Sequence, residues 1–103
     1  MLAINNNLLA GTLPSQLGLL NLETFLAQQN TIQGQIPETL WNNVNLIELR
    51  LDRNFLTGTL SGSVGSLSSI LRLRLSENRL SGFLPILLGR LSTLGTTSAV
   101  VYI

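Results

Sequence analysis

The sequence predicts an α/β repeat solenoid, in which about four copies of one short unit stack and each contributes a strand and a helical turn. Two regular series carry this prediction. The first is a series of asparagines: Asn7, Asn30, Asn54 and Asn78. The second is a series of glycines: Gly11, Gly34, Gly58 and Gly82. Both series have spacings of 23, 24 and 24 residues, and a shared period of this length is typical of stacked repeats.

Each copy follows the pattern L-x-L-x-x-N-x-L-x-G-x-L/I-P, as from Leu73 to Pro85. The leucines of L-x-L alternate with variable residues, so they point to one side of a short strand. The asparagine amide can bond backbone groups that are left unpaired where the chain turns. Glycine permits a tight backbone and proline fixes φ for the return segment. The next segment, as in 88–94, has apolar residues at i, i+3 and i+6, which suits a 3₁₀ turn. No copy can bury its apolar side alone, so the copies must stack.

The string from Asn30 to Pro37 resembles the plant-type leucine-rich repeat, which also occurs in diatoms and other algae. The resemblance covers residues 2–94. It implies a right-handed solenoid with a parallel β-sheet on the concave face, an extra short strand near the G-x-I-P segment, and short 3₁₀ or extended segments on the convex face. The repeats are expected at roughly 2–24, 25–48, 49–72 and 73–96, with 95–103 as a degenerate fifth repeat or a tail.

Some positions depart from the family pattern. The first repeat is one residue short before Leu22. In the second repeat, Trp41 and Asn43 stand where glycine and leucine are usual, and in the third Ser61 replaces the proline. We expect Trp41 to pack at a corner of the repeat. Phe25 holds a core position, whereas Phe55 and Phe83 hold variable ones.

The two ends of the chain also differ from the family. A fifth copy would place Thr97 and Ala99 at its two apolar strand positions. The family's cysteine-bearing N-terminal cap is missing, and stacks with bare ends expose the edges of their core. We therefore expect a part of a longer solenoid, a truncated product or a degenerate paralogue.

The composition excludes most catalytic classes. The 103 residues include no His, Cys or Lys, so the usual nucleophile pairs, zinc sites and phosphate-binding lysines cannot be assembled. Glu48 and Asp52 are expected about 13 Å apart on one strand, beyond the roughly 5–9.5 Å of a glycosidase pair. A net charge of +1 provides no field for nucleic acid. We predict a non-catalytic protein without a metal or cofactor. The sequence also shows no signal peptide and no apolar stretch near the ~20 residues of a transmembrane helix.

The variable strand residues predict a binding surface on the concave face. The candidate ligand-binding residues are Glu48, Arg50, Asp52, Arg53, Arg72, Arg74, Ser76 and Glu77. Neighbouring strands lie ~4.8 Å apart, so three contacts are expected: Glu48 with Arg72, Arg53 with Glu77, and the like-charged Arg50 with Arg74. The plain alternative is a set of exposed ion pairs that contribute little energy.

Arg72-Leu73-Arg74 indicates a carboxylate clamp, since both guanidinium groups face one side of a strand and guanidinium binds carboxylate in a bidentate way. The peptide-sensing proteins that the chain resembles use an Arg-x-Arg of this spacing to hold a peptide's terminal carboxylate. The resemblance therefore implies a protein or peptide ligand and a parent protein at the cell surface, plasma membrane or outside the cell. No N-x-S/T sequon accompanies it.

Two other functions remain open. The chain could be a structural spacer that contacts only neighbouring leucine-rich repeats, or a truncated product without function. The predicted concave patch is on the order of 300 Å², which is smaller than the about 800 Å² that one partner buries in a standard interface. This difference favours a role within a longer solenoid.

Overall fold

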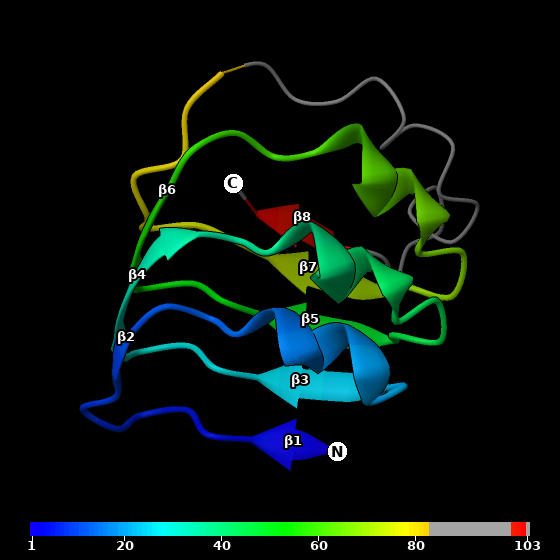
Figure 1. Cartoon of the computed structure of the whole chain (residues 1–103), viewed down its shortest axis with the longest axis horizontal. Coiled ribbons are helices and arrows are strands. Elements are labelled where there is room, and N and C mark those ends of the chain that lie inside the picture. The colour runs from blue at the N-terminus through cyan, green and yellow to red at the C-terminus, as the bar shows by residue number, and fades with distance from the viewer. Residues whose placement is uncertain (83–99, 103) are drawn as a thin grey trace.

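Parallel strands, one from each repeat, form the main sheet of the protein. The computed structural model describes residues 1–82 and 100–102. Within them the sheet has the order β1-β3-β5-β7-β8, and Figure 1 shows these strands stacked one above another. The strands are β1 (Leu2–Ala3), β3 (Thr24–Leu26), β5 (Glu48–Arg50), β7 (Arg72–Arg74) and β8 (Val100–Tyr102). The solvent side of this sheet is called the concave face below, after the family's shape.

A second parallel sheet runs along one edge of the stack. Its order is β2-β4-β6, and its strands are β2 (Ala10–Gly11), β4 (Thr31–Gln35) and β6 (Phe55–Thr57). A single bridge between Thr59 and Ser81 continues the pairing into the next repeat. The extra short strand near the G-x-I-P segment is thereby confirmed. The four repeat glycines have φ between 82° and 88°, a region in which residues with a Cβ are strained.

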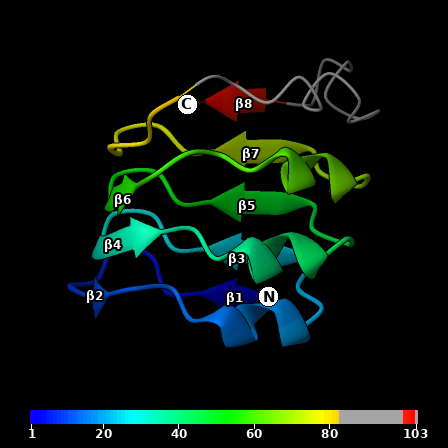
Figure 2. The ribbon, with the colours of Figure 1, turned by 45° about the horizontal axis from the view of Figure 1, so that its top comes forward.

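Short 3₁₀ segments close each repeat on the side away from the main sheet (Figure 2). They are η1 (Ser15–Leu19), η2 (Glu38–Asn42) and η3 (Gly62–Ser66), as the apolar spacing predicted. The core lies between these segments and the strands. Leu40 and Val64 from the 3₁₀ side and Phe25, Leu49 and Leu73 from the strands are all fully buried in one cluster.

The asparagine series bonds each repeat to the one before it. The Asn54 Oδ1 accepts a hydrogen bond from the Ile32 backbone N–H at 3.1 Å. The Asn54 Nδ2 donates to Leu51 O in its own repeat and to Ala27 O in the preceding repeat, both at 3.0 Å. Asn30 and Asn78 make the same kind of bridge. Each amide therefore satisfies backbone groups that the turn leaves unpaired.

Asn43, which departs from the family pattern, forms a second bridge of this kind on the convex side. It is completely buried. Its Oδ1 accepts from Leu22 N at 2.7 Å, and its Nδ2 donates to Leu40 O at 2.9 Å and Leu17 O at 3.1 Å. Asn21 stands in the shortened turn of the first repeat with φ of 50°, a left-handed conformation that asparagine tolerates. Both departures thus support the joint between the first two repeats.

Ser61, which replaces the proline of the third repeat, caps η3. Its backbone has φ of −69° and ψ of 148°, close to the −65° and 137° of Pro37 in the preceding repeat. The Ser61 hydroxyl accepts from Ser63 N at 3.0 Å and donates to the Glu38 carboxylate at 2.6 Å. These serines hold the pKa of Glu38 below its usual value, Ser61 having the larger effect.

Two aromatic predictions are confirmed, and one prediction about the fifth repeat is wrong. Trp41 is 2% exposed within the core cluster and Phe25 is fully buried. The strand that pairs with β7 is β8, and it places Val101 beside Leu73. The distance along the chain is 28 residues, from 73 to 101, where the repeat pattern predicts 24. Val-Val-Tyr has the β-branched and aromatic residues that strands favour. Thr97, Ala99 and Phe83 lie outside the described residues.

Replacing Asn54 with alanine is expected to lower the free energy of unfolding by about 3 kcal/mol, because several buried backbone groups lose their partner at once. Asn7→Ala is the matched control. Its exposed amide donates to Ile4 O and Asn5 O within its own turn, so its loss should cost under about 1 kcal/mol. Urea denaturation of both variants measures the difference, and equal losses would contradict the role of the asparagine bridge.

Removing the Ser61 hydroxyl is expected to destabilise the protein more at neutral pH than in acid. The folded-state pKa of Glu38 lies below its usual value of 4.5, so its contribution is present above that value and is lost as the pH falls through the folded-state pKa. The capping bond to Ser63 N does not titrate. The stability difference between wild type and Ser61→Ala should therefore shrink between pH 6 and pH 3 to the part due to capping. Ser68→Ala, at an exposed position, serves as the control.

Candidate functional site

The parallel register brings the predicted charged columns together on the concave face. Glu48 pairs with Arg72, and Arg50 pairs with Arg74, as Cα partners of β5 and β7. The register prediction for these two columns is confirmed. Arg50 and Arg74 are half-buried, so two guanidinium groups share one short stretch of sheet surface.

Four of the predicted site residues lie in the turns after the strands instead of in the strands: Asp52, Arg53, Ser76 and Glu77. The alternating pattern predicts outward strand positions for them, but β5 ends at Arg50 and β7 at Arg74. Arg53 and Glu77 have φ of 60° and 58°, which turns the chain toward the buried asparagine. Backbone pairing continues through this turn, because Arg53 N donates to Ser76 O at 3.0 Å.

Asp52 is buried, which corrects the prediction that it faces outward on the strand. It is 3% exposed. The Arg50 Nε and Nη2 donate to the two carboxylate oxygens of Asp52 at 3.3 and 3.2 Å. This bidentate pair occupies both oxygens, so Asp52 positions Arg50 and has little surface for a ligand. The Arg-x-Asp spacing was the signal in the sequence, since residues two apart in extended backbone share a side.

The two predicted inter-repeat ion pairs are present, and both are exposed. Arg53 Nε lies 2.9 Å from Glu77 Oε2, with side chains 56% and 63% exposed. Arg72 Nη1 lies 3.8 Å from Glu48 Oε1, which is longer than a hydrogen bond. Because solvent screens both pairs, they contribute little to stability. The Arg72 side chain is 63% exposed, and its donors can still reach a second carboxylate.

A small depression lies beside Arg72 at the beginning of the strands. Its volume is about 130 Å³, and it is lined by Thr24, Ile47, Glu48, Leu71 and Arg72. Ile47 and Leu71, which immediately precede β5 and β7, were not among the predicted site residues. Their signal in the sequence is weak, because an apolar residue before a strand also fits a core position.

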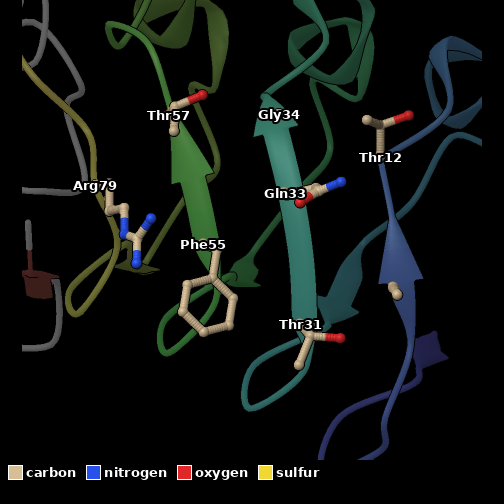
Figure 3. Close-up of a pocket in the computed structure, with 8 residues that line it drawn as sticks. Thr12, Thr31, Gln33, Gly34, Phe55, Thr57 and Arg79 are labelled. Atoms are coloured by element: carbon tan, nitrogen blue, oxygen red, sulfur yellow. The ribbon is translucent and has the colours of Figure 1, made fainter.

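A larger, open groove lies on the second sheet, away from the concave face (Figure 3). Its volume is about 600 Å³. The residues that line it are Ala10, Thr12, Thr31, Gln33, Gly34, Phe55, Thr57 and Arg79. The repeat pattern indicated this groove only through Phe55, a large aromatic residue at a variable position.

The repeat, the two parallel sheets and the asparagine bridges define a leucine-rich-repeat protein. The family model named Leucine Rich Repeat matches residues 45–67 and 69–91. Together with the solved structures described next, this match shows that the chain belongs to the leucine-rich-repeat proteins and has repeats of the plant type. No curated protein sequence matches the chain. No helix within the described ranges is long and apolar enough to cross a membrane.

Solved structures of plant receptor ectodomains share this fold. The ectodomain of the Arabidopsis thaliana membrane receptor kinase GASSHO1/SCHENGEN3, in complex with CASPARIAN STRIP INTEGRITY FACTOR 2, is 33% identical with a TM-score of 0.84, over 86% of this chain and 11% of that one. The Arabidopsis receptor kinase HAESA, in complex with the peptide hormone IDA and the co-receptor SERK1, is 31% identical with a TM-score of 0.83, over 87% and 16%.

A third structure matches over a larger share of its own length. The BIR3–SERK2 complex from Arabidopsis thaliana is 30% identical with a TM-score of 0.81, and the match covers 96% of this chain and 52% of that chain. The chain therefore spans between 11% and 52% of the length of these three structures.

The buried Arg50–Asp52 pair is expected to matter more for stability than the exposed Arg53–Glu77 pair. Asp52→Asn should lower the free energy of unfolding by about 2 kcal/mol, because a half-buried guanidinium loses its counter-charge. Glu77→Gln, the matched control, should change it by less than about 1 kcal/mol. Chemical denaturation at neutral pH compares the two, and a larger effect of Glu77→Gln would contradict the structural role of Asp52.

Proposed function

We propose that the chain is a non-catalytic module that binds an extended peptide or protein segment on its concave face. Arg72 and Arg74 of β7 bind a carboxylate of that ligand. The observation that carries the proposal is the Arg72 side chain, which is 63% exposed, is held only loosely by Glu48 at 3.8 Å, and borders the 130 Å³ depression. A guanidinium in this state can bind a carboxylate in a bidentate way.

The charge balance of this surface also favours an acidic group. The eight candidate residues include four arginines and three carboxylates, a net charge of +1: Arg50, Arg53, Arg72, Arg74, Glu48, Asp52 and Glu77. Asp52 is buried against Arg50. A carboxylate ligand therefore meets the exposed edge of Arg72 with only Glu48 as a competing anion beside it.

The relatives support the proposal at the level of the family. HAESA is solved with a peptide hormone, and RGFR1, 30% identical to this chain, is described as a plant peptide hormone receptor in complex with RGF2. By this likeness, a peptide or protein is the expected partner, and the parent protein is expected at the cell surface. No metal or cofactor takes part in the proposed binding.

The alternative, a structural spacer between other leucine-rich repeats, is supported by one observation. Leu8 and Leu19 of the first repeat are 91% and 83% exposed, and a further repeat stacked on this edge would cover such side chains. A spacer and a binding module differ in one measurable property, which is the affinity of the concave face for a ligand.

The test is selection of peptides with free C-termini from a random library on the immobilised full chain, followed by titration of each enriched peptide. Arg72→Gln is expected to weaken binding about tenfold or more, since one charge-assisted hydrogen-bonded contact is lost. Arg72→Lys should recover only part of the loss, because lysine keeps the charge but not the planar fork.

The matched control is the same peptide with an amidated C-terminus. Its affinity should be weak and insensitive to Arg72→Gln, because the carboxylate that Arg72 binds is missing. Equal affinity of the amidated and free peptides would contradict the clamp. Failure to enrich any peptide would contradict the binding function and favour the spacer.

A further inference from the structure

The open groove on the second sheet is separate from the proposed peptide site. Its lining residues come from β2, β4, β6 and the following turn, and none of them belongs to the concave columns. All of its lining side chains lie at exposed positions, and only Gly34 is half-buried. Gly34 has φ of 82° and its missing Cβ would lie 2.8 Å from the Thr12 methyl carbon, so glycine keeps the floor of the groove low.

One end of the groove carries an aromatic ring next to a cation. Phe55 is 43% exposed, and the Arg79 guanidinium carbon lies 5.2 Å from the centre of its ring. Figure 3 shows the two side chains on neighbouring strands of the groove wall. The contact orders both groups through a cation–π interaction. Arg79 is also the only ionisable residue that lines this groove, so a bound molecule meets positive charge without a competing carboxylate.

The rest of the lining is polar and uncharged. Thr12, Thr31 and Thr57 offer hydroxyl groups and Gln33 offers an amide, and in Figure 3 the Gln33 side chain extends toward the side of β2. The Thr31 hydroxyl donates to Leu9 O at 2.8 Å, which leaves its oxygen lone pairs as acceptors. Hydroxyl and amide groups of this kind pair with the hydroxyl groups of a sugar.

We propose that this groove binds an oligosaccharide that carries carboxylate groups. The flat apolar side of a sugar ring would rest against Phe55, its hydroxyl groups would pair with the threonines and Gln33, and a carboxylate would pair with Arg79. A peptide fits less well. The groove has no aliphatic pocket larger than Ala10 for apolar side chains, and the backbone groups of the central strand β4 are already paired on both sides.

The groove also has the shape for a linear chain molecule. It crosses β2, β4 and β6 and reaches Arg79 in the next repeat, a span of roughly 14 Å at ~4.8 Å for each repeat. Equivalent positions recur in each repeat, so similar polar groups face a chain at regular intervals. The lack of depth predicts modest affinity that depends on the one aromatic and the one ionic contact.

The test is isothermal titration of the full chain with a short oligomer of galacturonic acid and, as the matched control ligand, with the corresponding neutral galactose oligomer. The acidic oligomer is expected to bind more tightly. Phe55→Ala should weaken the binding of both oligomers about tenfold, and Arg79→Gln should weaken only that of the acidic one, by a similar factor. Leu8→Ala, at a position 91% exposed and outside both sites, should change neither.

Three outcomes would overturn the proposal: no heat of binding with the acidic oligomer at millimolar concentration, affinities that Phe55→Ala and Arg79→Gln leave unchanged, or binding of an acidic peptide but not of the sugar through the same two residues. Since all substituted side chains are exposed, loss of folding is not expected, and a thermal melt of each variant checks this. Binding of peptides to the concave face is independent of the result.

Discussion

The stack depends on buried backbone groups finding partners at every turn. Each strand ends in a sharp turn inside the protein, where water cannot reach the free amides and carbonyls. The Asn54 side chain meets this need by bonding its own repeat and the preceding repeat at the same time. One residue type at one position therefore sets both the shape of the turn and the distance between repeats. Asn43 extends the same solution to the opposite side of the core.

The sites follow from the regular register that these bridges impose. Because every repeat enters the sheet at the same point, variable residues line up in columns, and Arg72 comes to lie beside Glu48. The second sheet repeats this logic on another face, where Phe55 and Arg79 from successive repeats meet. Two surfaces of different chemistry thus arise from one scaffold. The concave face is charged, and the edge groove is polar with a single cation.

Much of the fold was predictable because each repeat obeys local rules. The L-x-L alternation, the asparagine, the glycine and the 3₁₀ spacing each have a direct physical reason, and the cross-repeat pairs Glu48–Arg72 and Arg53–Glu77 followed from period and strand spacing. The burial of Asp52 was not predictable in this way, because it depends on Arg50 folding back over it. The placement of Val101 beside Leu73 was missed because a four-residue shift in the last repeat breaks the period.

The sequence by itself determined the repeat, its period, the class of fold and the absence of the side chains that most enzymes use. These properties depend on residue type and spacing, which are visible along the chain. Only the tertiary structure decided which of the charged residues are exposed, how loosely Arg72 is held, and that Phe55 and Arg79 border one groove. Such properties depend on side-chain direction and on contacts between residues about 24 positions apart, and these exist only after the repeats have stacked.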